Sequence, residues 1–256
     1  MPFKGARIVA ALGMAVIAAT AALAQEETVR AVNFLPNNQS FGRPFVDYVS
    51  LVNAAGKGAI QIAILPSGTM SPFDMGVAIK NGAVDMGNVP ATFFQNLLPV
   101  GEAVKLGNTT AAEQRANGAF DLMDKLYQEK VNAKLLSIWG HEAQFHAYLR
   151  AKPIDSATLA GFKMRTTPIY RAFFRSLGAD LIQAPPGEVY TLLERGAVDG
   201  YGWPLWDIKS PGWDRVTRYR VEPGFYAVTS SIHINLDKWR KLSKAQQDVL
   251  AGQAIA

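Results

Sequence analysis

The sequence contains no cysteine among its 256 residues. This excludes disulfides, thiolate nucleophiles and cysteine-containing metal sites, while an oxidising compartment stays permitted. The sequence also lacks a cluster of lysine and arginine interleaved with aromatic residues, so its formal charge of +5 does not indicate a nucleic-acid-binding surface. It has no Gly-x-Ser-x-Gly elbow, no phosphate-binding glycine loop and no dinucleotide fingerprint. We therefore expect no cofactor.

Histidine is scarce as well, with three in the whole chain. His141 and His146 are five residues apart with Glu142 between them, whereas a metalloprotease helix needs its two histidines at i and i+4. The third, His233, lies far along the chain in an expected core strand. These residues predict neither a metal site nor a catalytic set, and the protein is expected not to be an enzyme. A secreted metal-dependent hydrolase is the alternative from another functional class.

Residues 1–24 have the pattern of a cleaved secretory signal. Lys4 and Arg7 form a basic region, residues 8–21 are apolar, and Ala22-Leu23-Ala24 is a small-residue cleavage site. The apolar run is short for a transmembrane helix, which is the alternative interpretation. We therefore expect an exported protein whose mature chain begins at residue 25.

The remaining sequence alternates between strand and helix patterns. Strands are expected at 29–33, 60–65, 84–87, 134–139, 147–150 and 162–164, and helices at 43–54, 72–81 and 110–130. Thr110 and Glu113 form the capping box of the last of these helices. Two further strand–helix units follow between 162 and 201, and the segment 216–235 is extended with a turn at Pro223-Gly224. This order predicts an α/β protein of two lobes joined by crossing strands.

Arg165 is the first candidate binding residue. The pattern places a short strand before it, Thr167 as a helix N-cap and Pro168 as the first helical residue. Ligands of open α/β sheets bind where strands end and helices begin, and the planar guanidinium fork matches a carboxylate. Taken alone, a surface arginine in a solvent-exposed ion pair is the simpler interpretation.

The motifs around Arg165 occur in a recognisable order. Gly161-Phe-Lys-Met-Arg165 precedes Glu188-Val-Tyr190 and Gly196-Ala-Val-Asp-Gly200. This series resembles the DctP family, the extracytoplasmic solute-binding subunits of TRAP (tripartite ATP-independent periplasmic) transporters. The resemblance runs from Val29 to the last residue. It implies a periplasmic protein that captures a small organic carboxylate through Arg165 and delivers it to membrane permease subunits. A binding protein of an ABC-type importer is the alternative within binding proteins.

The resemblance also implies an architecture: the periplasmic-binding-protein fold with mixed sheets and crossing hinge strands. Lobe I is expected to comprise 25–142 and 226–256, and lobe II 143–225. Members of the family carry further C-terminal helices, whereas this sequence stops within a helical pattern at 243–250. A C-terminally truncated chain is therefore expected.

Further site residues follow from the resemblance. Gln144, expected in a turn, occupies the place of a polar ligand contact. Trp203 resembles the tryptophan of the 2-oxo-acid-binding branch, but Gly202 stands where that branch has a cation-binding glutamate, which puts a bound cation in doubt. Trp203 and Tyr201 suggest an apolar or ring-bearing acid stacked in the cleft, or else core aromatics of lobe II. Asn33 and Phe225 are weaker candidates for lining the cleft from the two lobes.

Overall fold

The computed structural model describes residues 26–107 and 109–254. The expected signal segment, residues 1–24, lies outside them. Within the described ranges, no helix combines the length and the apolar character needed to cross a bilayer. The strands are β1 Glu27–Asn33, β2 Ile60–Ile64, β3 Met86–Asn88, β4 Ala133–Leu149, β5 Lys163–Thr166, β6 Asp180–Gln183, β7 Gly200–Pro204 and β8 Tyr219–Asn235. The helices are α1 Arg43–Ala55, α2 Pro72–Lys80, α3 Ala111–Ala116, α4 Ala119–Val131, α5 Arg171–Ser176, α6 Val189–Glu194, α7 Leu236–Lys241 and α8 Lys244–Gln253.

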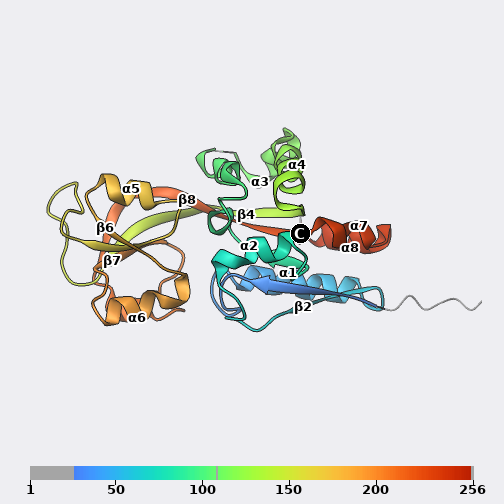
Figure 1. The fold of residues 1–256 in the computed structure, drawn as a ribbon, viewed down its shortest axis with the longest axis horizontal. Coiled ribbons are helices and arrows are strands. Elements are labelled where there is room, and N and C mark those ends of the chain that lie inside the picture. The colour runs from blue at the N-terminus through green and yellow to red at the C-terminus, as the bar shows by residue number, and fades with distance from the viewer. Residues whose placement is uncertain (1–25, 108, 255–256) are drawn as a thin grey trace, which may run out of the picture.

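The strands described form one mixed sheet in the order β2-β1-β3-β8-β4-β7-β5-β6. Each end of the sheet is a parallel group of three strands, β2-β1-β3 or β7-β5-β6, and the long strands β8 and β4 lie antiparallel between them. Figure 1 shows these two long strands connecting the lobe that carries α1–α4, α7 and α8 to the lobe that carries α5 and α6. The expected two-lobed α/β fold with crossing strands is confirmed.

The helix expected over 110–130 is two helices. Its capping box is present, because Thr110 Oγ1 accepts from the Glu113 amide and the Glu113 carboxylate accepts from the Thr110 amide. Gly118 then adopts a left-handed conformation with φ +83°, which an α-helix does not tolerate in its interior. The apolar spacing continues across this break, so the pattern alone predicted one element.

Two expected interruptions are absent from the long strands. Residues 141–146, predicted as a turn, belong to β4, whose pairing with β8 shifts register between Trp139 and Ala143. Gly140 allows this bulge with φ +89°. Likewise Pro223 and Gly224, predicted as a turn, lie inside β8. Both strands continue through these positions, but as bulges: the pairing of the two strands skips residues 140–142 of β4 and 222–225 of β8.

His233 on β8 is fully buried between the rings of Phe94 and Tyr127, with ring centroids 5.4 and 5.3 Å away. Burial lowers its pKa to about 4, against a smaller upward effect of its hydrogen bond with Ser231. The unfolded chain takes up this proton near pH 6.5, whereas the folded protein does so only near pH 4. Stability is therefore lost as the pH falls through this window.

We expect the free energy of unfolding to decrease by roughly 3 kcal/mol between pH 6.5 and pH 4 through His233 alone. Urea titrations of the wild type and His233→Gln at several pH values in this range give the free energy of unfolding of each protein. The contribution of His233 is the difference between the two proteins in how steeply that free energy falls with pH. Parallel pH profiles of the two proteins would show that the imidazole does not carry it.

Candidate functional site

A small cavity of about 30 Å³ lies where the carboxyl ends of the two parallel strand groups face each other. Phe34 follows β1, Thr92 follows β3, Thr167 follows β5, and Trp203 and Pro204 end β7; all five line the cavity. Phe145 of β4 and Tyr226 of β8 also line it. Ligands of open α/β sheets bind beyond the carboxyl ends of the strands. The topology therefore marks this cavity as the candidate binding site.

The lobes touch across this site. Ser40 Oγ donates to Asp207 Oδ2 at 2.7 Å, and the rings of Phe41 and Trp206 stack with centroids 5.0 Å apart. The volume holds one or two water molecules, far below the 300 Å³ or more of a ligand pocket. A ligand can therefore enter the site only when the lobes separate along this contact, and the lobes would then close around it less tightly than they do here.

Arg165 lies in the middle strand of its parallel group and is completely buried. Its Nε donates to the Ala184 carbonyl at 2.8 Å and its Nη1 donates to the Tyr170 hydroxyl at 2.9 Å, whereas Nη2 has no partner among the described atoms. No carboxylate of the described residues lies within ion-pair distance of the guanidinium. A buried cation without a counter-charge is unfavourable, and a bound anion would supply both the missing charge and the missing acceptor.

The local structure around Arg165 differs from the sequence-based expectation. The strand extends to Thr166, so Arg165 lies within it rather than at its end. Thr167 is not an N-cap: the next helix, α5, starts at Arg171 with Tyr170 before it and has no side-chain cap. The intervening turn places Tyr170 so that its hydroxyl accepts from Arg165 Nη1.

Gly202 gives Tyr170 the space for this contact. The Tyr170 hydroxyl, which accepts from Arg165, donates to the Gly202 carbonyl at 3.3 Å. A Cβ atom at position 202 would lie 3.0 Å from Cε2 of the Tyr170 ring and 3.3 Å from Phe174 Cζ. The glycine is thus part of the support of Arg165, and a side chain as large as glutamate would displace that ring.

Aromatic rings form most of the remaining wall. Trp203 packs edge-on against Trp213 with centroids 4.5 Å apart and lies 6.2 Å from Phe145, while its Nε1 donates to the Asp207 carbonyl at 2.7 Å. Burial, Tyr170 and Glu102 raise the pKa of Tyr226 well above its usual value, and Arg165 lowers it. Tyr226 is therefore a neutral hydroxyl at physiological pH. Of the described residues that line the cavity, Arg165 alone carries a formal charge.

The structure brings only some of the sequence-predicted residues together. Arg165 and Trp203 line the cavity. Tyr201 does not: it is buried on the same strand, stacked on Tyr148 at 5.2 Å, with its hydroxyl bonded to Thr217. Tyr201 is a core aromatic in this structure. It lies near the start of β7, whereas the cavity is lined by the last two residues of that strand.

The other three predicted residues also lie outside the cavity lining. Asn33 donates to Asn37 Oδ1 and the Gly42 carbonyl and accepts from Asn88, so its amide fixes the loop after β1. Gln144 is an exposed residue in the interior of β4, not in a turn. Phe225 packs behind the wall, against Phe145 and Phe173. Asn33 does end β1, as predicted, but hydrogen bonds within lobe I engage its amide. Gln144 and Phe225 lie within β4 and β8, where turns were predicted.

Thr92, Thr167 and Tyr170 line the cavity but were not predicted as site residues. Thr92 and Thr167 are almost fully buried, and the Oγ1 atom of each has no hydrogen-bond partner among the described residues. The Pro90-Ala91-Thr92 segment after the expected strand 84–87 was the available signal for the first, since it follows a strand end. No local pattern indicates that these hydroxyls are unpaired.

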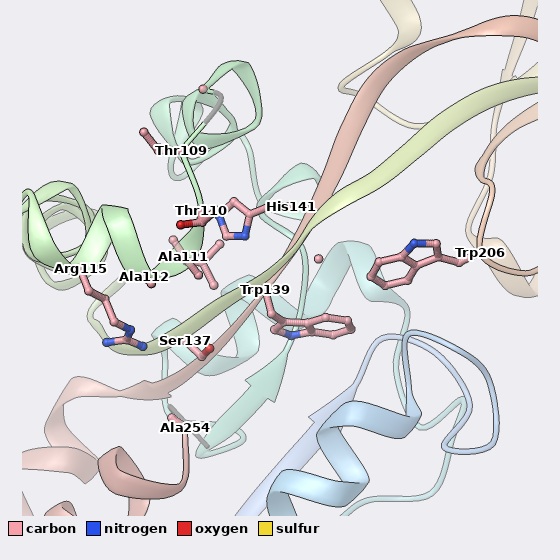
Figure 2. A pocket seen from close by; sticks show the side chains of 13 residues that line it. Thr109, Thr110, Ala111, Ala112, Arg115, Ser137, Trp139, His141, Trp206 and Ala254 are labelled. Atoms are coloured by element: carbon pink, nitrogen blue, oxygen red, sulfur yellow. The ribbon is translucent and has the colours of Figure 1, made fainter.

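A larger pocket of about 640 Å³ is lined by residues of both lobes. Figure 2 shows its walls, with Thr110 and Arg115 of the α3 region, Trp139 and His141 of β4, and Trp206 of the other lobe. Its cationic side chain, Arg115, has partners within the protein. Arg115 Nη2 donates to the Leu136 carbonyl, and the guanidinium lies over the Phe120 ring. Its larger size alone does not make it the better candidate, because none of its described lining side chains has a buried polar atom without a partner, as Arg165 does.

The histidine pair considered for a hydrolase is divided between two environments. His141 Nε2 lies 3.2 Å from Gln114 Oε1, whereas the buried His146 Nδ1 lies 3.2 Å from the Val221 carbonyl and 3.1 Å from Glu222 Oε2. Within the ranges that the structure describes, no group of three His, Cys, Asp or Glu side chains could hold a metal ion. The two histidines do not form a common site.

Comparison with known proteins identifies similar sequences and structures. Residues 32–255 match the sequence profile of a family described as bacterial extracellular solute-binding protein, family 7 (DctP). The chain is 24% identical over 182 residues to a monocarboxylate 2-oxoacid-binding periplasmic protein of a Nostoc species, an alignment covering 67% of this chain and 50% of that protein. It is 25% identical over 211 residues to the 2,3-diketo-L-gulonate-binding periplasmic protein of Escherichia coli, covering 80% of this chain and 64% of the relative.

Among solved structures, a TRAP periplasmic solute-binding protein of Roseobacter denitrificans with bound L-galactonate superposes with a TM-score of 0.79. The two chains are 22% identical, and the match covers 91% of this chain and 79% of the other. The likeness extends over both lobes and shows a common fold. The chain spans about half the length of the first curated relative above.

Proposed function

The chain belongs to the DctP family of bacterial extracellular solute-binding proteins, and from this membership we propose that it captures a small organic carboxylate for a TRAP-type transporter. The observation that carries the proposal is Arg165, a fully buried guanidinium whose Nη2 is unpaired and which no described carboxylate neutralises. A ligand carboxylate is the group that completes this site, because it accepts hydrogen bonds and supplies the counter-charge.

Capture would proceed by opening and closing of two lobes. Lobe I comprises 25–142 and 226–256, and lobe II comprises 143–225. The support for this division is the pairing of β4 with β8, whose register shifts between Trp139 and Ala143 and between Phe145 and Ala147. Such irregularities concentrate bending at a few residues, as hinges do. The contacts of Ser40 with Asp207 and of Phe41 with Trp206 would break on opening.

The remaining parts of the proposal concern location and partners. Residues 1–24 would direct export to the periplasm and be removed there. The closed, loaded protein would then dock on the membrane permease subunits of the transporter. Binding without chemical conversion is consistent with a cavity whose described lining offers one cation, hydroxyls and aromatic rings but no nucleophile–base pair.

Calorimetry on the purified protein tests the carboxylate proposal. A panel of monocarboxylates, dicarboxylates, sugar acids and aromatic acids would be titrated, each beside the neutral amide of the same skeleton. We expect at least one acid to bind while its amide does not, because the amide cannot neutralise Arg165. Equal binding of every acid and its amide, or binding of neutral solutes only, would contradict the proposal.

Ligand affinity is expected to be independent of metal ions. Position 202 carries no carboxylate, Tyr170 fills the space of a side chain there, and none of the described residues in the cavity lining is acidic. Titrations in EDTA, in sodium buffer and in potassium buffer should give dissociation constants that agree within about twofold. A loss of affinity on chelation that calcium or sodium restores would show that another residue holds a cation.

A further inference from the structure

We propose that Thr92 and Thr167, one on each lobe, bind an uncharged oxygen of the ligand, so that the preferred acid is a monocarboxylate carrying a hydroxyl or keto group on an otherwise apolar body. This inference deepens the proposed function and rests on it for the position of the carboxylate. It assigns to two side chains a selectivity that Arg165 alone does not provide.

The hydroxyl groups of Thr92 and Thr167 are both buried and without a hydrogen-bond partner among the described atoms. Thr92, in the 3₁₀ turn Ala91–Phe93 after β3, is 5% exposed, and Thr167, directly after β5, is 4% exposed. The Oγ1 atom of each lacks a hydrogen-bond partner among the described atoms, although both residues line the same cavity as the unpaired Arg165 Nη2. Buried hydroxyls without partners are unfavourable. Three residues that line one small cavity thus each carry an unsatisfied polar atom, and a ligand that filled the cavity could supply their partners.

The composition of the wall limits the rest of the ligand. Apart from these three groups and the hydroxyls of Tyr170 and Tyr226, the described lining consists of aromatic rings, including Trp203, and of prolines and one valine. The nearby Lys105 is already paired with the buried carboxylate of Glu102, so it offers no free charge for a second carboxylate. A dicarboxylate would leave one of its charges unpaired, and a body rich in hydroxyls would leave several oxygens without partners.

The position of the pair also gives it a role in closure. Thr92 belongs to the lobe of β1–β3 and Thr167 to the lobe of β5–β7. A ligand held at Arg165 can reach both hydroxyls only when the two lobes close around it. The oxygen substituent therefore stabilises the closed state specifically, whereas the carboxylate can be bound from lobe II alone.

A matched ligand pair tests the assignment. 4-Methyl-2-oxopentanoate and 4-methylpentanoate have the same carboxylate and branched body and differ in one keto oxygen. For the wild type we expect the keto acid to bind about 10- to 100-fold more tightly, the effect of leaving buried hydroxyls unpaired. 2-Hydroxy-4-methylpentanoate should behave like the keto acid, because a threonine hydroxyl can donate or accept.

The variants Thr92→Val and Thr167→Val remove each hydroxyl at nearly constant shape. We expect each to reduce the keto-acid preference to below about threefold while the affinity for 4-methylpentanoate stays within about threefold of wild type. Thr92→Ser and Thr167→Ser keep the hydroxyl and should keep the preference, which covers the case that a valine variant does not fold. Thr229→Val, at a buried threonine outside the lining, is the matched control and should leave both dissociation constants unchanged.

The outcomes separate the two proposals. Equal wild-type affinity for the two acids, or a preference that survives in both valine variants, would overturn the assignment of the threonines and leave carboxylate binding at Arg165 intact. Failure of every carboxylate of the calorimetric panel to bind would overturn the proposed function, and this inference with it.

Discussion

Arg165→Ala is expected to weaken binding of the carboxylate ligand by about 2–5 kcal/mol, the effect of removing one partner of a buried charge pair. The guanidinium is held on two sides, by the Ala184 carbonyl and the Tyr170 hydroxyl, so that Nη2 presents a fixed donor to the cavity. The variant loses the charge and the donor together. Isothermal titration calorimetry with the best acid of the panel measures the effect directly.

Arg165→Lys is the sharper comparison. Lysine keeps the positive charge but offers an ammonium group in place of the planar fork, and it cannot donate to Ala184, Tyr170 and a ligand with the same geometry. We expect it to bind much more weakly than wild type. Without ligand, Arg165→Met should melt within about 4 °C of wild type, because a buried cation without a counter-charge contributes little net stability. Near-native affinity in the alanine variant would remove Arg165 from the site.

Trp203→Ala is expected to destabilise the protein by about 3–5 kcal/mol, as large aromatic-to-alanine changes in packed interiors do. Trp203 is buried among Trp213, Phe145 and Phe41, and its indole N–H satisfies the Asp207 carbonyl. For a protein of this size the change corresponds to a melting temperature lower by on the order of 10 °C. Thermal unfolding followed by circular dichroism measures it.

Two further substitutions show which part of the Trp203 side chain stabilises the protein and whether its position matters. Trp203→Phe keeps most of the ring volume and loses only the N–H bond, so it should recover most of the stability. Trp206→Ala changes the same residue type three positions away, where the side chain is half exposed, and should cost less than about 1 kcal/mol. Similar melting temperatures for Trp203→Ala and Trp206→Ala would show that the indole at 203 does not support the wall of the cleft.

The sequence by itself determined the features that depend on neighbouring residues. The periodicity of 43–54 predicted α1, which buries Phe45, Tyr48, Val49 and Val52. The Thr110 capping box formed as expected, because both partners lie within one turn. The motif order around Arg165 indicated the family and singled out Arg165 as the candidate carboxylate-binding residue. These motifs could be recognised because they are read directly along the chain.

Only the tertiary structure decided which polar groups are left unpaired. Asn33 was a candidate for the cleft, but the side chain of Asn88, 55 residues further along the chain, and the Gly42 carbonyl engage its amide. Conversely, Thr92 and Thr167 become candidates because no described partner reaches their hydroxyls. The continuity of β4 and β8 through predicted turns has the same origin. Strand pairing and hydrogen-bond satisfaction depend on residues far apart in the chain, and no local pattern specifies them.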